Sequence, residues 1–227
     1  MRKTVVRIVL VLSVLTLAGI AALATAGHHG IVTSRDGRMA IATRGASQVT
    51  PWYESAGHTP IAGNISTDAF GKYFCCYGYT ISGPNSFLKS ANWVAIPFTP
   101  SANYTVNRVE VSVGWGGDGT NGVTVSLNAD FCGLPGAVLA STDATGLQAY
   151  GDCCALVIGQ DNAGVPVTQG TQYWVVVGTD TTTETTFDAW AFNSTDMRFY
   201  PYAYYSTTNG TWRPDNGLLP GYAVFGQ

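Results

Sequence analysis

A cluster of aromatic residues between Phe199 and Tyr205 is the part of the sequence whose residue types and spacing point most directly to a chemical role. Successive residues of a β-strand project to opposite faces, so Tyr200, Tyr202 and Tyr204 share one face and Tyr205 lies on the other. A two-layer domain buries only one face of each strand, so we expect one aromatic row to meet solvent. Exposed tyrosine and tryptophan rings can stack on sugar rings, because they combine apolar area with a polar tip.

Trp212 extends this aromatic set across a predicted hairpin turn. Asn209-Gly210 is typical of two-residue turns between antiparallel strands. Pairing back from that turn places Trp212 diagonal to Tyr205 on the same face. Packing inside the protein is the alternative role for all these rings. The candidate ligand-binding residues are Tyr200, Tyr202, Tyr204, Tyr205 and Trp212.

Residues capable of acid–base or nucleophilic catalysis form no clear constellation in the sequence. A hydrolytic triad needs a histidine held rigidly beside its nucleophile, whereas the three histidines, at positions 28, 29 and 58, lie in segments without a periodic apolar pattern. A glycosidase needs two carboxylates about 5 to 10 Å apart in a cleft, and Glu110, Glu184 and Asp188 are candidates by type only. We therefore predict that the protein is not an enzyme, with a glycoside hydrolase as the alternative.

Metal binding is weakly indicated. The stretch 116–123 resembles one turn of a calcium-binding nonapeptide repeat, but those sites form between stacked repeats and only one copy is present. A glycine-rich hairpin loop is the favoured interpretation. Loop oxygens such as those of Asp118, Asp130 or Asp161 could still hold a structural calcium ion. We predict no cofactor and no catalytic metal.

The cysteines favour disulfides over a zinc site. The five are Cys75, Cys76, Cys132, Cys153 and Cys154. No C-x-x-C pair is present, and adjacent residues on a strand face opposite ways, which disfavours zinc. In an oxidising compartment we expect Cys132 to pair with Cys153 or Cys154, closing a loop of about 20 residues worth roughly 3 kcal/mol. The remaining member of that pair is available to Cys75 or Cys76, and one thiol is left over.

Short β-type runs separated by turn residues must position these side chains. Residues 108–115 alternate apolar with polar residues, as do residues 123–128, and the glycine-rich stretch between them predicts a hairpin. Residues 173–177 are continuously apolar, which suits a central strand covered on both faces. We predict an all-β fold, a two-sheet antiparallel sandwich of jelly-roll type, with a closed β-barrel as the alternative.

The N-terminal segment has the pattern of a secretory signal. Three basic residues precede an apolar run from Ile8 to Leu23, and Ala24-Thr25-Ala26 supplies small side chains for cleavage after Ala26. A retained membrane anchor is the alternative. The predicted organisation is a signal peptide over residues 1–26, an extended N-terminal arm over 27–65 and a β-sandwich domain over 66–227. No later apolar stretch approaches the length of a membrane span.

Composition excludes some classes of partner. Cleavage after Ala26 would leave 8 basic against 14 acidic side chains, because the signal segment holds three basic residues and no acidic one. An acidic surface repels phosphate backbones, so we expect no binding to nucleic acid. The chain remaining after cleavage is long enough to bury one core without a metal or a dense disulfide framework.

Three stretches resemble the secreted bacterial β-domains called choice-of-anchor proteins. They are residues 121–130, 133–139 and 170–177, with Cys153-Cys154 and residues 188–190 placed as in similar sequences. The resemblance covers residues from about 70 to the end of the chain, and it implies a secreted sandwich but no particular activity. Members carry varied C-terminal anchors, whereas this chain ends at Gly226-Gln227 without a sorting motif or hydrophobic tail, so we expect free secretion.

These observations lead to two functional expectations. The first is a secreted, non-catalytic binding or adhesion module, with an extracellular polysaccharide as the candidate ligand. The alternative is a structural matrix or envelope protein that contacts other protein chains at a cell surface. An aromatic row facing solvent would favour the first role, and exposed strand edges would favour the second.

Overall fold

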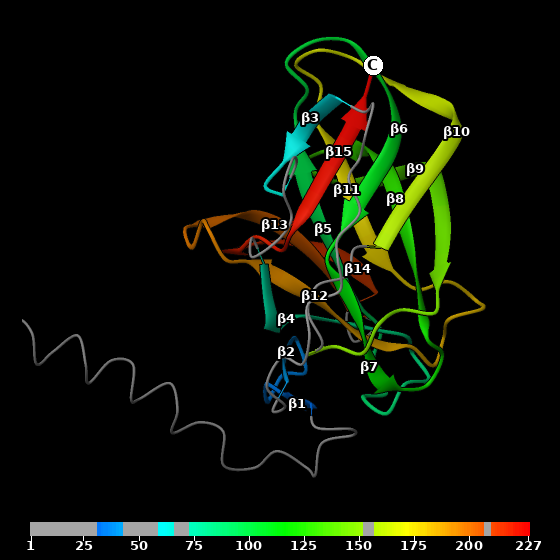
Figure 1. Cartoon of the computed structure of the whole chain (residues 1–227), viewed down its shortest axis with the longest axis vertical. Coiled ribbons are helices and arrows are strands. Elements are labelled where there is room, and N and C mark those ends of the chain that lie inside the picture. The colour runs from blue at the N-terminus through cyan, green and yellow to red at the C-terminus, as the bar shows by residue number, and fades with distance from the viewer. Residues whose placement is uncertain (1–30, 43–58, 66–72, 152–156, 207–209) are drawn as a thin grey trace, which may run out of the picture.

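The computed structural model describes residues 31–42, 59–65, 73–151, 157–206 and 210–227, without the side chains of 73–76 and 157–163. Every element assigned in these ranges is a strand (Figure 1). The strands are β1 (Ile31–Thr33), β2 (Met39–Ala42), β3 (Thr59–Gly63), β4 (Tyr73–Ser82), β5 (Asn92–Phe98), β6 (Tyr104–Val111), β7 (Val113–Asp118), β8 (Gly122–Phe131), β9 (Leu134–Thr145), β10 (Val157–Val167), β11 (Tyr173–Gly178), β12 (Phe187–Asn193), β13 (Phe199–Ser206), β14 (Thr211–Leu218) and β15 (Tyr222–Gly226).

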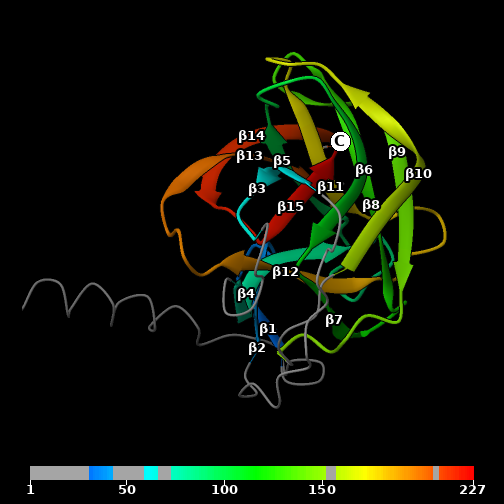
Figure 2. The same cartoon turned by 45° about the horizontal axis from the view of Figure 1, so that its top comes forward.

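The strands form two antiparallel sheets. The larger has 11 strands with the path β1-β2-β4-β5-β11-β8-β9, to which β12 is joined through β4, β7 through β12, and the β13–β14 hairpin through β5. The smaller has the order β10-β6-β15-β3 and lies in front of β11, β8 and β5 in Figures 1 and 2. In the described part of the chain β9 pairs only with β8, and β10 only with β6. The predicted two-sheet arrangement is therefore confirmed, and the closed barrel is wrong.

Alternating apolar residues fill the space between the sheets. Val123, Val125 and Leu127 of β8 face Val109 and Val111 of β6 in one buried cluster. All six residues of β11 are buried, as expected for a strand covered on both faces. Burying a side chain of this size contributes about 1.5 to 3 kcal/mol, so the intersheet core is the main source of stability.

The predicted hairpin between residues 108–115 and 123–128 is wrong. The chain changes sheets at Ser112, between β6 in the small sheet and β7 in the large one, and β7 then pairs with β12 and not with β8. The Ser112 hydroxyl donates to the carbonyl oxygens of Ala191 and Gly221, at 3.0 and 3.1 Å, which fixes the crossing point. A continuous alternating pattern cannot reveal such a switch, because both halves bury the same kind of side chain.

The segment predicted to form a loose N-terminal arm contributes strands to both sheets. β1 and β2 form a hairpin that pairs with β4 at the edge of the large sheet, and β3 pairs with β15 in the small one. Ile31 and Ala40 are buried there. The two strands have only three and four residues, too short to show an apolar period in the sequence, and Ile31, Ala40 and Ala42 pack in a buried cluster with Phe187 and Phe225.

The predicted signal peptide lies outside the described residues. Within the described ranges, no helix has the length and apolar character needed to cross a membrane.

Candidate functional site

The β13–β14 hairpin has a longer loop than the predicted two-residue turn. Ser206 pairs with Thr211, so residues 207–210 form the connection, and Gly210 closes it with φ near +65° and an N–H donated to the Ser206 carbonyl oxygen at 2.9 Å. The pairing is shifted by two residues from the prediction. Trp212 therefore lies directly opposite Tyr205 instead of diagonal to it, and both still share one face.

Tyr202 is part of the core and does not face solvent. Its side chain is 3% exposed, and its ring stacks on Tyr79 of β4 with centroids 4.7 Å apart. The hydroxyl is hydrogen-bonded to the Arg38 guanidinium and to Asp215. Burial is the main cause that raises the pKa of Tyr202 to about 12. This ring is a buried anchor with a satisfied polar tip.

Tyr204 is covered by a cation. The Arg38 guanidinium carbon lies 3.8 Å from the centroid of the Tyr204 ring, and the same group donates to Asp215 Oδ2 at 2.7 Å. The hydrogen bond from Arg38 is the largest cause that lowers the pKa of Asp215, against the opposing effect of burial. Arg38, in the β1–β2 turn, therefore fastens the N-terminal hairpin onto β13 and β14. One face of Tyr204 is occupied by this contact.

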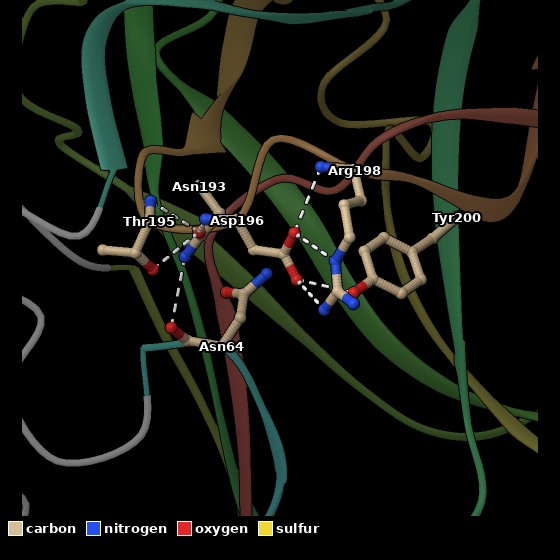
Figure 3. A network of polar contacts seen from close by, with 6 residues as sticks. All are labelled: Asn64, Asn193, Thr195, Asp196, Arg198 and Tyr200. Carbon is tan, nitrogen blue, oxygen red and sulfur yellow. Dashed lines mark hydrogen bonds and ion pairs between the residues drawn. The ribbon is translucent and has the colours of Figure 1, made fainter.

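Tyr200 belongs to a polar network at the start of β13 (Figure 3). Its hydroxyl donates to Asp196 Oδ2 at 2.5 Å, and Arg198 donates to both oxygens of the same carboxylate, at 2.9 and 2.7 Å. Hydrogen bonds from Arg198 and then Tyr200 lower the pKa of Asp196. Asn193 accepts the N–H groups of Thr195 and Asp196, which shapes the turn that presents the carboxylate.

The opposite face of the hairpin carries partly exposed rings. Trp93 of β5 stacks on Tyr205 with centroids 4.3 Å apart and planes at 14°, and Tyr205 meets Trp212 edge-on at 5.7 Å. All three side chains are half-buried. The register places them side by side, because Tyr205 is the partner of both Trp93 and Trp212. We call Trp93, Tyr205 and Trp212 the aromatic trio.

A small apolar cluster holds the trio in place. Trp212 packs against the cluster made by Ala95, Trp174, Val176 and Ala203. Trp93 donates its indole N–H to Thr179 Oγ1 at 2.8 Å. Small residues at 95 and 203 leave room for a large ring to lie across the sheet, so the trio is supported from below and beside while remaining partly open to solvent.

Trp93 was missed by the sequence analysis. Residues 92–98 do alternate, since Val94, Ile96 and Phe98 enter the main core while Trp93 lies on the other face. Nothing in that pattern shows which face is covered. The predicted contact residues lie in the aromatic cluster of β13 and β14, where Tyr200, Tyr202 and Tyr204 have structural contacts.

The carboxylates considered for catalysis lie in different surroundings. Glu110 is buried beside Arg108 at 2.6 Å. Glu184 accepts a hydrogen bond from Asn85. Asp188 is fully buried on β12, where burial raises its pKa, and one oxygen accepts the Gly116 N–H at 3.3 Å. The three histidines lie outside the described residues, and the absence of catalysis stays a prediction.

The structure brings no metal-binding cluster together around the aspartates considered for calcium, within the described residues. Asp130 Oδ1 accepts hydrogen bonds from Gln172 and Trp174, and Oδ2 accepts one from Gly133. These bonds outweigh burial and lower the pKa of Asp130. Across the described ranges no group of three His, Cys, Asp or Glu residues could hold a metal ion. The side chain of Asp161 lies outside the description.

Cys132 occupies the tip of the β8–β9 hairpin. With Gly133 it forms a two-residue turn in which both φ angles are positive, 55° and 80°, and its thiol is exposed and free of any disulfide. Cys153, Cys154 and the side chains of Cys75 and Cys76 lie outside the described residues. The predicted disulfides have no support in the described part of the chain.

Comparison with known proteins found no matching family model, no matching curated protein and no matching solved structure. The resemblance to choice-of-anchor domains stays a prediction.

Proposed function

We propose that this protein is a secreted, non-catalytic binding module for extracellular polysaccharide, and that the aromatic trio is its contact surface. The observation that carries the proposal is the alignment of Trp93, Tyr205 and Trp212 at one register position on three neighbouring strands. Partly exposed rings fixed by sheet packing can meet the apolar faces of sugar rings at a small cost in side-chain entropy.

The proposal changes which of the predicted residues contact the ligand. Tyr205 and Trp212 keep that role and Trp93 joins them. Tyr202 and Tyr204 act as anchors for the hairpin, and Tyr200 orders the turn before β13. The candidate surface therefore lies on the opposite face of β13 from the row of three tyrosines.

The expected ligand is uncharged. No charged residue belongs to the trio, and the polar partner of Trp93 is the neutral hydroxyl of Thr179, whose Oγ1 accepts the indole N–H at 2.8 Å. Hydroxyl groups of this kind suit a neutral, hydroxyl-rich ligand. The excess of acidic over basic side chains disfavours polyanions such as nucleic acids.

A glycan array followed by titration tests the proposal. The secreted protein, expected to begin at Gly27, should bind a neutral polysaccharide, and Trp212→Ala or Tyr205→Ala should weaken that binding about tenfold or more, as aromatic anchors do at interfaces. Tyr77→Ala is the matched control, because Tyr77 is an exposed aromatic on β4 outside the trio. Equal binding by wild type and the Trp212 and Tyr205 variants would exclude this surface.

One observation favours the alternative role in contacts with other protein chains. Phe131, Val138 and Leu139, on β8 and β9, are 71%, 59% and 41% exposed. Exposed apolar side chains near a free strand edge are typical of association surfaces. The double variant Phe131→Ser with Val138→Ser should abolish any self-association detected by sedimentation and leave polysaccharide binding intact. Loss of both properties would mean that a single surface serves both contacts.

A further inference from the structure

The trio is one end of a row that crosses the large sheet. Trp212, Tyr205 and Trp93 occupy paired positions on β14, β13 and β5. On the other side of β5, Gly178 of β11 pairs with Thr124 of β8, and Thr124 pairs with Asp143 of β9. Directly paired residues of an antiparallel sheet project from the same face. Thr124 and Asp143 therefore lie on the face that carries the trio.

Gly178 joins the two halves of this row. A Cβ atom added at Gly178 would lie 2.8 Å from Cγ of the Trp93 ring, so the indole rests against the Gly178 backbone. Gly178 has no side chain, so no side chain of β11 separates the Trp93 ring from Thr124. The Trp93 indole lies over Gly178 instead, so the aromatic surface of the trio reaches across β11 toward Thr124 of β8.

The far half of the row offers hydrogen-bonding groups. Thr124 Oγ1 donates to Asp143 Oδ1 at 2.8 Å. This is the one hydrogen bond of the Asp143 side chain within the described part of the chain, and Asp143 is exposed. Its second carboxylate oxygen is thus available to a donor from a ligand, and the bond from Thr124 holds the carboxylate in place. A carboxylate accepts the hydroxyl groups of a sugar and repels an anionic polymer.

We infer that the site takes a linear, neutral polysaccharide that crosses the strands, with some sugar units on the aromatic trio and others hydrogen-bonded to Asp143 and Thr124. This inference rests on the proposed function. Neighbouring strands lie about 4.8 Å apart, so five steps from β14 to β9 follow roughly 24 Å of sheet surface, which curves so that the start of β9 at Leu134 packs against the same cluster as Trp212. A row of that length contacts several consecutive sugar units, and affinity should therefore rise with chain length.

Titration calorimetry with dimers and hexamers tests the inference. The probes are neutral β-linked oligosaccharides of glucose and of N-acetylglucosamine, with hexagalacturonate as the anionic contrast. Asp143→Ala should weaken hexamer binding about tenfold, the loss of a hydrogen bond to a charged group, and leave dimer binding unchanged. Trp212→Ala should weaken both. Thr145→Ala is the control, since Thr145 is exposed on the same strand two residues away. Near-ultraviolet circular dichroism checks the fold, and Asp143→Asn keeps the side-chain shape.

The outcomes separate the two claims. Unchanged hexamer binding by both Asp143 variants, together with weakened binding by Trp212→Ala, would overturn the extended row and leave the trio as the site. An equal loss for dimer and hexamer in Asp143→Ala would also overturn it, because Asp143 would then contact the same unit as the trio. Unchanged binding in Trp212→Ala, or no binding of any neutral probe by wild type, would overturn the proposed function itself. Preference for hexagalacturonate would refute the neutral ligand class.

Discussion

The two faces of the β13–β14 hairpin differ in what covers their aromatic rings. On one face Tyr202 and Tyr204 meet Tyr79 and Arg38, and on the other Tyr205 and Trp212 meet Trp93. The first face is closed by a segment from the N-terminal part of the chain, whereas the second remains partly open. Rings of the same chemical type thus stabilise the fold on one side and present a surface on the other.

The two faces differ in how the polar groups of their aromatic side chains are hydrogen-bonded and how far the rings are buried. The Tyr202 hydroxyl is satisfied by Arg38 and Asp215, so the ring can be buried without an unpaired polar group. On the open face the Trp93 N–H is bonded to Thr179, which orients the indole, and the residue is still partly exposed. Substitutions on the closed face should therefore act mainly on stability, and those on the open face mainly on binding.

Tyr202→Ala should produce the largest effect. The substitution removes a buried aromatic ring stacked on Tyr79 and should lower the free energy of unfolding by about 3 to 5 kcal/mol, as other large-to-small aromatic substitutions in cores do. Urea denaturation followed by tryptophan fluorescence measures it. Tyr205→Ala, on the open face of the same strand, is the matched control and should cost clearly less. Equal losses would mean that the two faces are not different.

Arg38→Ala should have an intermediate effect. It removes the ion pair with Asp215, the hydrogen bond to Tyr202 and the contact with the Tyr204 ring. The Asp215 side chain is 39% exposed and solvent screens the pair, so we expect a loss of only about 1 to 2 kcal/mol in urea denaturation. Arg35→Ala, an exposed arginine in the same turn, is the control. A loss no larger than the control's would show that backbone pairing and the buried residues of β1 and β2 hold the hairpin without the Arg38 contacts.

The stability difference between wild type and Arg38→Ala should depend on pH. The pKa of Asp215 is lowered in the folded protein from its ordinary value of 3.8, chiefly by the hydrogen bond from Arg38. A carboxyl whose pKa is depressed by folding contributes stability above its unfolded pKa and loses it as the pH falls through the folded value. The difference should be constant between pH 5 and pH 7 and should shrink below pH 4. Denaturation series at fixed pH values measure it, and Asp215→Asn should remove the dependence.

Sequence periodicity predicted the sheets better than it predicted the site. It identified the buried alternation of β8 and the covered strand β11, because apolar spacing follows directly from the pleat. It also showed which tyrosines share a face. It could not show which face is covered, since Arg38 and Tyr202 are 164 residues apart in the chain. Trp93 was missed, and the burial of Asp188 was not foreseen, for the same reason: their surroundings come from distant strands.

Arg198→Ala should produce the smallest effect on stability. Arg198 shares the Asp196 carboxylate with Tyr200, which lies on the same face of β13 as Tyr202 but is not buried as Tyr202 is. Arg198 is 78% exposed, and its pair with Asp196 at 2.7 Å lies where water screens both charges. Exposed ion pairs of this kind contribute little, since the attraction is offset by the entropy of holding two mobile side chains. We therefore expect no resolvable change in the urea midpoint, and no change in polysaccharide affinity, because this corner (Figure 3) is not part of the trio.

Arg38→Ala, measured in parallel, supplies the contrast between an ion pair that covers a ring and one that only borders it. A midpoint shift in Arg198→Ala as large as that of Arg38→Ala would mean that the turn before β13, and not the clamp on Tyr202 and Tyr204, fixes the hairpin to the domain.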